Sequence, residues 1–453
     1  MLPVDDLQHV ELNAEFQQAL AVMEDSHAHC FITGRAGTGK STLLQYFRAN
    51  TKKKVVVLAP TGVAAVNVQG QTIHSFFGFK PDITPEKARR LAMTARRRNP
   101  KSIFHGVETI ILDEISMVRA DLFECMDVFL RTVRSNARIP FGGVQLILIG
   151  DLYQLPPVVT TAERSVFASR YPGPHFFNAR VARDLQLEFV ELTQVYRQPD
   201  PEFVTMLNAV RNNSLNEEII ARFNSRHNSQ FQPTDNGFIT LTSMNEPAHL
   251  INAQRLSEIE AIEHRFSGDL EGEFTRDALV TDPVLTLKVN AQVMLLNNDS
   301  QGRWVNGTLG RVEEIRLNDQ TIIVELEDET VVEVTRHKWE VFRYDFDTVS
   351  GSVITESMGT FTQFPLRLAW AITIHKSQGK TYDRVVVDVG RGTFASGQMY
   401  VALSRCRSLE GLVLRQPLRR HHVIVDHRIT QFFENPQGCF PDEEVAEQQT
   451  FDF

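Results

Sequence analysis

The octapeptide at residues 34–41 constrains the fold of this chain more than any other stretch. It reads Gly34-Arg35-Ala36-Gly37-Thr38-Gly39-Lys40-Ser41, and it stands between the apolar run 30–32 and an apolar pattern of helical spacing over 43–47. A strand, a glycine-rich turn and a helix in this order form a P-loop, whose backbone N–H groups face a β-phosphate. In such a loop Lys40 bridges the β- and γ-phosphates and the Ser41 hydroxyl binds Mg²⁺. We therefore expect ATP and Mg²⁺ as the ligands.

Size and composition are those of an ordinary globular chain. Its 453 residues, 42% of them hydrophobic, predict about two to four domains. The net charge of −9 does not by itself favour nucleic acid, so phosphate contacts must come from local basic surface. The four cysteines form no CxxC pair and indicate neither a zinc site nor a disulfide framework. Without a basic leader or an apolar stretch of about 18 residues, we expect a cytoplasmic protein of bacterial type with no membrane partner.

Two segments after the P-loop predict contacts with a substrate. The β-branched run 55–59 predicts a buried parallel strand, and the segment 60–65 stands at its carboxyl end, where ligands of doubly wound sheets gather. The segment 71–77 then offers hydroxyls, an imidazole and two phenylalanines, a mixture that binds single strands and stacks bases. Phenylalanine is also an ordinary core residue, so a packing role for this segment stays open.

The segment from Lys80 to Lys101 is strongly basic. It holds eight lysines and arginines against Asp82 and Glu86. This composition predicts a small basic insertion over about 78–105, for which we favour phosphate contact over an idle solvated helix.

Two acidic residues set the expected reaction. Asp113 and Glu114 end the apolar strand pattern 107–112, where Asp113 can hold Mg²⁺ through its water shell and Glu114 can act as the general base for water. This arrangement favours hydrolysis over phosphoryl transfer to another substrate. Gln154 follows the next strand, 144–149, and can sense the γ-phosphate; a purely structural turn is the alternative.

A second α/β pattern begins near residue 191. Strands are expected at 238–241, 384–389 and 412–414, and an alternating, hairpin-like pattern over about 289–363 predicts an inserted antiparallel barrel. The segment 365–381 reads as an apolar helix that breaks into a polar loop, and the acidic tail from Asp442 is expected to be disordered.

Three further side chains are candidates for contact with the nucleotide. Arg197 and Arg405 could each supply the guanidinium that a composite site between two lobes needs at the γ-phosphate. Gln17, on a helical pattern just before the P-loop, is the candidate for the adenine edge, although a surface glutamine fits the same pattern.

The motifs stand in the order of superfamily-one helicases: GRAGTGKS, APTGVAA, QTIHSFF, LDEISMV, GDLYQLPPV, VYRQ, ITIHKSQGKT and YVALSR. The stretch 114–145 resembles the signature of the petite integration frequency (Pif-one) family, the 5′-to-3′ branch, and the similarity covers residues 10 to 430. There are two departures: the family's adenine-contacting glutamine aligns nearer Phe16 than Gln17, and Leu152-Tyr153 replaces a more usual aromatic pair.

The resemblance implies an α/β fold with two RecA-like P-loop NTPase lobes. It places the first lobe with its N-terminal helix at 1–190, a basic wedge insertion at about 78–105, the second lobe at 191–290 and 363–435, and an inserted Src-homology-three-like barrel at 291–362. The tail follows at 436–453.

It also implies a function: an ATP-driven motor that moves 5′-to-3′ on single-stranded DNA and unwinds duplexes, G-quadruplexes and RNA–DNA hybrids. The expected partners are single-stranded DNA and 5′-tailed duplex or quadruplex DNA, the expected state is a monomer that can dimerise on DNA, and the family's roles lie in DNA repair, recombination and telomere maintenance. The alternative from a different class is a nucleotide-switched ATPase that clamps single strands without processive unwinding.

Site residues follow from the resemblance by position. The expected catalytic residues are Lys40, Glu114, Gln154, Arg197 and Arg405, and the metal ligands are Ser41 and Asp113. The expected ATP-binding residues are Gln17, Gly34, Ala36, Gly37, Thr38, Gly39, Lys40, Ser41, Thr42 and Gly379. The expected DNA-binding residues are Pro60, Thr61, Gly62, Val63, His74, Ser75, Phe76, Thr242, Asn245, His375, Ser377 and Gln378.

Overall fold

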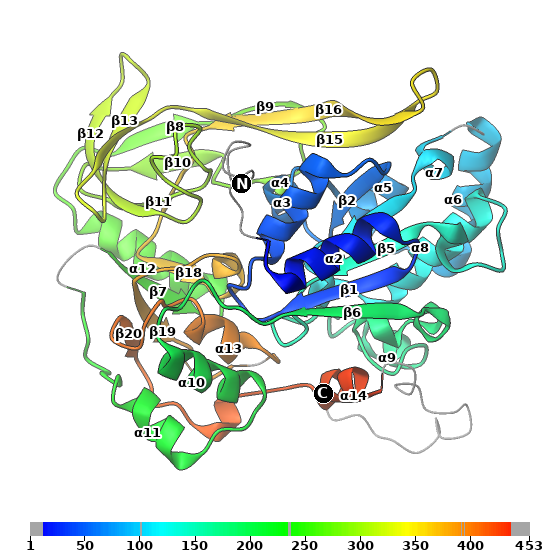
Figure 1. Ribbon diagram of the computed structural model, residues 1–453. Coiled ribbons are helices and arrows are strands. Elements are labelled where there is room, and N and C mark those ends of the chain that lie inside the picture. Colours follow the sequence, from blue (N-terminus) through cyan, green and yellow to red (C-terminus); the bar gives the residue numbers. More distant parts are fainter. Residues whose placement is uncertain (1–11, 100–101, 234–236, 391, 394, 436–453) are drawn as a thin grey trace.

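The computed structural model describes residues 12–99, 102–233, 237–390, 392–393 and 395–435 (Figure 1). The predicted acidic tail and Lys101 of the basic segment lie outside the described residues. Among the described residues, none of the helices has the length and apolar character needed to cross a membrane.

The first lobe is built on a six-stranded parallel sheet in the order β3-β2-β4-β5-β1-β6. The four inner strands of this order, β2, β4, β5 and β1, are buried on both faces, which is why they read as continuous apolar runs in the sequence. The predicted lobe boundary near residue 190 falls inside the last strand, whose Leu192 pairs with Gly34. The strands are β1 (His29–Gly34), β2 (Val55–Ala59), β3 (Gln71–Thr72), β4 (Thr109–Leu112), β5 (Gln145–Ile149) and β6 (Leu187–Leu192).

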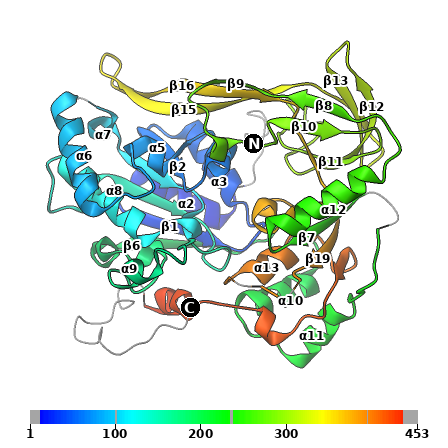
Figure 2. The same ribbon diagram turned by 180° about the vertical axis from the view of Figure 1, so that it is seen from behind.

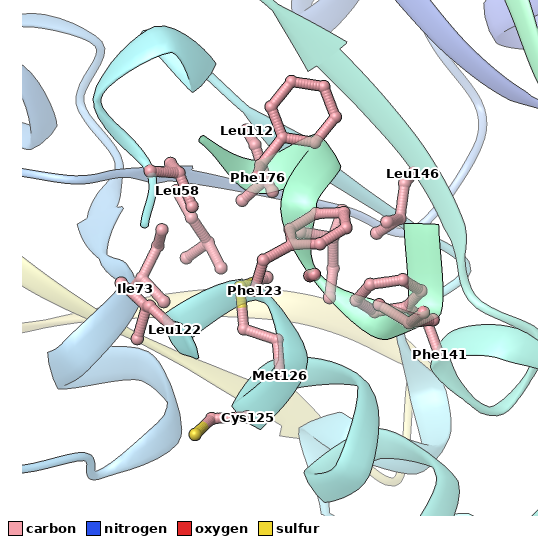
Figure 3. Packing of buried hydrophobic residues seen from close by; sticks show 14 of the residues in the cluster. Leu58, Ile73, Leu112, Leu122, Phe123, Cys125, Met126, Phe141, Leu146 and Phe176 are labelled. Carbon is pink, nitrogen blue, oxygen red and sulfur yellow. The ribbon is translucent and has the colours of Figure 1, made fainter. Parts of the chain in front are cut away.

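Helices cover both faces of this sheet. On one face α2 (Ala14–Asp25) and α3 (Lys40–Asn50) pack against the strands, and on the other α8 (Ala120–Val133) does so. Figure 3 shows the second contact, in which Phe123 and Met126 of α8 lie among leucines of the strands such as Leu58. The shorter helices of the lobe are α4 (Gly62–Asn67), α5 (Ile73–Phe77), α7 (Ile103–Gly106) and α9 (Arg164–Ala168).

The basic segment forms the helix α6 (Pro85–Arg98), which begins with Thr84 as its cap. Small residues, Ala88 and Ala92, face α8 and are fully buried, so the two helices pack closely. The three arginines of its last turn are exposed. The basic segment is therefore a helix attached to the first lobe with its charge directed outwards.

The second lobe holds a four-stranded parallel sheet in the order β18-β7-β19-β20. Its strands are β7 (Phe238–Thr242), β18 (Ala371–Thr373), β19 (Arg384–Asp388) and β20 (Leu412–Leu414). Around them stand α10 (Pro201–Arg211), α11 (Glu217–Asn224), α12 (Asn245–Ser257) and α13 (Gln398–Leu403).

The helix predicted within 365–381 is wrong. This stretch forms β17 (Leu366–Leu368), β18 and a 3₁₀ turn at His375–Ser377. Its apolar run is too short for periodicity to separate a buried helix from a buried strand. Pairing of β18 with β7, and of β17 with the antiparallel strand β11 (Gln292–Leu295), decides the outcome.

The antiparallel strands form three sheets. A five-stranded sheet has the order β14-β13-β12-β11-β17, a three-stranded sheet the order β15-β16-β9, and β10 pairs with β8. These strands begin before residue 291, at His264, and the hairpins expected over 309–334 are present. The bounds are β8 (His264–Ser267), β9 (Asp269–Gly272), β10 (Val284–Leu287), β11 (Gln292–Leu295), β12 (Leu309–Arg316), β13 (Thr321–Leu326), β14 (Val331–Val334), β15 (His337–Asp347) and β16 (Ser352–Gln363).

Two segments of the second half of the chain return to the first lobe. The long hairpin of β15 and β16 extends over it in both views, and the Tyr344 hydroxyl accepts a hydrogen bond from the Val57 N–H at 3.2 Å (Figures 1 and 2). At the C-terminal end α14 (His427–Glu434) packs beneath the first lobe, where Phe432 stacks on Phe177. The two lobes are thus joined on opposite sides.

Candidate nucleotide site and nucleic-acid groove

A cleft of about 720 Å³ lies between the two lobes at the carboxyl ends of the first-lobe strands β1, β4 and β5. Most of the residues expected at the nucleotide line it. These are Ala36, Gly37, Thr38, Gly39, Lys40, Ser41, Thr42, Asp113, Glu114, Gln154, Arg197, Gly379 and Arg405.

The P-loop wraps the floor of this cleft. Gly37 and Gly39 have φ angles of 84° and 86°, which only glycine adopts without strain, and α3 begins directly after them. The Lys40 ammonium donates to the carbonyl oxygens of Gly34 at 2.6 Å and Arg35 at 2.9 Å. Burial lowers the Lys40 pKa, against the opposing effect of nearby carboxylates. The backbone N–H groups, the helix N-terminus and the lysine together form a binding surface for phosphate.

Asp113 and Glu114 directly follow β4 and also line the cleft. Glu114 has φ 52° and ψ 45°, a left-handed conformation that a side-chain-bearing residue adopts at a cost and that clusters at functional sites. Burial raises the pKa of both carboxyls, that of Asp113 to about 7, where the charge of Glu114 adds to the effect. The oxygens of Asp113 and Ser41 are the ligand type that Mg²⁺ prefers, so these residues fit the expected metal.

Two arginines reach the cleft from the other side. Arg197 Nη2 donates to the Gly379 carbonyl at 3.0 Å, and the buried Arg405 donates through Nε to the Val401 carbonyl at 2.9 Å. Burial, together with the positive charge of Arg405, lowers the Arg197 pKa to about 9. Because their charges repel, a bound polyphosphate would stabilise both guanidinium groups here.

Gln378 is not where the sequence placed it. It was expected at the DNA strand, but its Nε2 donates to Glu114 Oε2 at 2.9 Å, beside the nucleotide cleft. The same nitrogen lies 3.5 Å from Gln154 Oε1, and Gln154 in turn contacts Asp151. Motif order along the chain does not tell which face of the turn its glutamine occupies, so this contact with Glu114 could not be predicted from the sequence.

Gln17 is also misplaced. It is exposed, its amide donates to the Leu12 carbonyl at 2.9 Å, and it is not among the cleft residues. Phe16, one residue earlier, lines the cleft instead, because successive helical residues point about 100° apart. Gly34, also expected at ATP, is not among the cleft residues; its carbonyl oxygen accepts a hydrogen bond from Lys40.

Several cleft residues were missed. They are Phe16, Gly150, Tyr196, Pro199, Thr381 and Arg407. Tyr196 is 53% exposed, and Asn13 donates to its hydroxyl at 3.2 Å. Its position directly before Arg197 was the available signal, since an exposed aromatic ring beside a phosphate-binding arginine is typical of a base-stacking surface.

A second cavity, of about 1120 Å³, lies on the first lobe beyond β2 and β3, and we call it the groove. Five residues predicted to contact DNA line it, namely Pro60, Thr61, Gly62, His74 and Ser75. Arg119 also lines it, paired with Asp121 at 2.7 Å and Glu163 at 3.0 Å. Thr275 of the second half of the chain borders the same cavity.

Other predicted DNA contacts lie elsewhere. Val63 is 39% exposed next to the groove, whereas Phe76 is buried in the core with its ring 4.9 Å from that of Phe77, so it cannot stack on a base in this structure. Thr242 and Ser377 are buried, and their hydroxyls donate to nearby backbone carbonyls.

Asn245 and His375 complete the predicted set. Asn245 is exposed at the start of α12, and His375 is half-buried in the turn after β18. Neither lines the groove. The structure thus brings five first-lobe candidates together in one cavity, whose lining includes none of the second-lobe candidates.

Comparison with known proteins agrees with this geometry. The PIF1-like helicase family matches residues 10–219. The ATP-dependent DNA helicase Pif1 of Bdellovibrio bacteriovorus is 33% identical over 97% of this chain and 94% of its own length. The chain belongs to the PIF1-like helicase family. The crystal structure of Bacteroides sp Pif1 with ADP-AlF4 has a TM-score of 0.82 and 35% identity, covering 95% of this chain and 98% of that one. The two parallel-sheet lobes are accordingly RecA-like.

Vertebrate members of the family are longer than this chain. The rat ATP-dependent DNA helicase PIF1 is 36% identical over 93% of this chain, and the chain spans 63% of that protein.

Proposed function

We propose that this chain is an ATP-dependent DNA helicase that moves 5′-to-3′ along single-stranded DNA. The observation that carries the proposal is the composition of the cleft, where a P-loop, an Asp–Glu pair and two arginines converge from different parts of the chain. Its relatives are named ATP-dependent DNA helicases, and Bacteroides Pif1 has been solved with ADP-AlF3 and ssDNA bound.

Each of these cleft residues has its own role in ATP hydrolysis. Lys40 and the P-loop N–H groups bind the β- and γ-phosphates, Glu114 takes the proton of the attacking water, and Arg197 and Arg405 stabilise charge at the γ-phosphate. When bound by Ser41 and Asp113, Mg²⁺ neutralises part of the phosphate charge.

Coupling to DNA follows from the position of the cleft between the lobes. The arginines belong to the segment after β6 and to the second lobe, so the distance between lobes sets their reach to the γ-phosphate. A strand lying in the groove and on the second lobe would favour closure and thereby speed hydrolysis. Repeated closing and opening then moves the strand.

The substrate proposal is duplex DNA with a 5′ tail, together with G-quadruplexes and RNA–DNA hybrids. We assign Pro60, Thr61, Gly62, His74 and Ser75 to the strand, since they line one cavity. The chain is proposed to act as a cytoplasmic monomer that can pair on DNA.

Two measurements test the proposal. ATP hydrolysis should rise at least about tenfold with single-stranded DNA, and Glu114→Gln should abolish turnover while leaving ATP binding intact, because an amide cannot accept the water's proton. Strand displacement should proceed on 5′-tailed duplexes and fail on 3′-tailed ones. Hydrolysis stimulated by DNA without displacement on any substrate would instead identify a nucleotide-switched single-strand clamp.

A further inference from the structure

The carboxylate of Glu114 is held by a side chain from the other lobe. Glu114 follows β4 of the first lobe, and Gln378 follows the 3₁₀ turn after β18 of the second, 264 residues further along the chain. The Gln378 amide donates to Oε2 at 2.9 Å, and Glu114 lines the nucleotide cleft. A glutamate side chain has three rotatable bonds, and one hydrogen bond at its end fixes the direction of both oxygens.

The turn that carries Gln378 is also bonded to both arginines. Arg405 Nη1 donates to the carbonyls of Ser377 at 3.3 Å and Lys380 at 3.1 Å. Arg197 Nη2 donates to the Gly379 carbonyl between them. A displacement of this turn therefore moves the contact to Glu114 and the contacts to both guanidinium groups at the same time.

The hydrogen-bonded chain continues through the interface between the lobes. Gln154 lies 3.5 Å from the Gln378 amide and donates to Asp151 Oδ2 at 3.3 Å, and Asp151 pairs with Arg211 of α10. Gln154, Asp151 and Arg211 are all buried. A hydrogen bond weakens steeply once donor and acceptor separate by a few tenths of an ångström, so the Gln378 contact depends on the spacing of the lobes.

We propose that Gln378 is a positioning residue for Glu114, which orients the carboxylate only when the second lobe is seated against the first. The proposal rests on the function proposed above, in which the lobes close on a DNA strand. In this proposal the turn at 375–380 transmits the effect of DNA-strand binding to the general base Glu114. Gln378 then acts at the nucleotide site instead of at the DNA.

The test compares Gln378→Leu with wild type in steady-state ATP hydrolysis with and without saturating single-stranded DNA. We expect the DNA-stimulated kcat to fall at least about tenfold and KM for ATP to change less than about twofold, because the contact orients the base and does not bind the nucleotide. Gln378→Glu keeps the shape but cannot donate when ionised, and it should be at least as impaired. Gln378→Asn, which keeps an amide on a shorter side chain, should have a kcat between those of wild type and Gln378→Leu.

Gln292→Leu is the matched control. Gln292 is a buried glutamine of β11 that donates to the carbonyls of Phe238 at 2.9 Å and Ala369 at 2.8 Å. Its loss should lower the melting temperature without changing kcat, basal or DNA-stimulated. If Gln378→Leu behaves in the same way, its role is structural and the proposal is overturned.

A double-mutant cycle with Glu114→Asp tests whether Gln378 acts through the base. The shorter carboxylate cannot reach the amide, so Gln378→Leu should cost less than about twofold in that background. Full additivity of the two changes would refute the contact. The cycle uses basal hydrolysis, so it remains decisive even if wild type is not stimulated by DNA, the result that would count against the proposed function.

Discussion

Asp151 and Arg211 form an ion pair across the two lobes, with Oδ1 and Nη2 3.1 Å apart and both side chains buried. The Arg211 guanidinium also lies over the Tyr153 ring, 4.2 Å from its centroid. The pair joins the loop after β5 to the last turn of α10, so it holds the first-lobe glutamine loop against the second lobe.

Arg211→Ala should destabilise the protein by about 3 kcal/mol, because it leaves the Asp151 carboxylate buried without its cation. Denaturant unfolding followed by circular dichroism measures this loss. Arg222→Ala is the control, since Arg222 and Glu202 form an exposed pair whose removal should cost less than about 1 kcal/mol. Equal losses of unfolding free energy in the two variants would show that the buried pair contributes no more to stability than the exposed one.

Gly397→Ala should lower kcat for ATP at least about tenfold. A Cβ at Gly397 would lie 2.2 Å from the Gln154 carbonyl oxygen and 2.5 Å from that of Tyr153, so the substitution pushes α13 and Arg405 away from the first lobe. Gly390→Ala is the control. Gly390 has a similar positive φ of 58°, but nothing lies within 4 Å of the new methyl group, so this variant shows the effect of backbone strain without a steric clash. Similar kinetics for both alanine variants would contradict the steric argument.

Tyr196→Ala should raise KM for ATP roughly tenfold, because its exposed ring lines the cleft and offers a stacking surface. Gln17→Ala should leave KM within about twofold of wild type, since Gln17 lies outside the cleft. Tyr196→Phe keeps the ring and should resemble wild type. A large rise in KM for Gln17→Ala would restore the original assignment of that glutamine.

Stability should fall as the pH drops from 7 to 5, in part through His29. Its Nδ1 accepts a hydrogen bond from the Leu146 N–H at 3.0 Å, and burial lowers its pKa to about 4. The folded state therefore resists protonation that the unfolded chain accepts near pH 6.5, so this stability is complete above pH 6.5 and is lost as the pH falls towards 4. The expected loss by pH 5 is about 2 kcal/mol. His29→Asn should flatten this part of the stability profile measured by denaturant unfolding.

The exposed arginines of α6 should matter for unwinding more than for hydrolysis. The test variant changes Arg97 and Arg98 to Glu. Arg96 is kept because it donates a hydrogen bond to the Ser135 hydroxyl at 2.7 Å. Duplex unwinding should fall at least about fivefold with little change in DNA-stimulated ATPase, because the cleft is untouched. Lys52→Glu, at another exposed site, is the control. A proportional fall in both activities would assign α6 to general DNA binding, and no change would make it an ordinary solvated helix.

The P-loop and the Asp113-Glu114 pair could be predicted because their geometry is local. A strand, a glycine turn and a helix fix the position of Lys40 within a few residues of sequence, whatever the rest of the chain does. The parallel strands of both lobes were predictable for a related reason, since burial on both faces demands continuous apolar runs. The stretch 365–374 was misread because a short apolar run satisfies a helix and a strand equally.

What only the tertiary structure decided is which side chains meet across the lobes. The sequence determined that Phe76 and Gln378 belong to functional motifs, but packing turned Phe76 into the core and turned Gln378 towards Glu114. Local propensity and spacing act over a few residues, whereas the contact between Gln378 and Glu114 joins positions 264 residues apart. Such contacts depend on how two separately formed sheets dock, and the free energy that docks them is spread over many buried residues of both lobes.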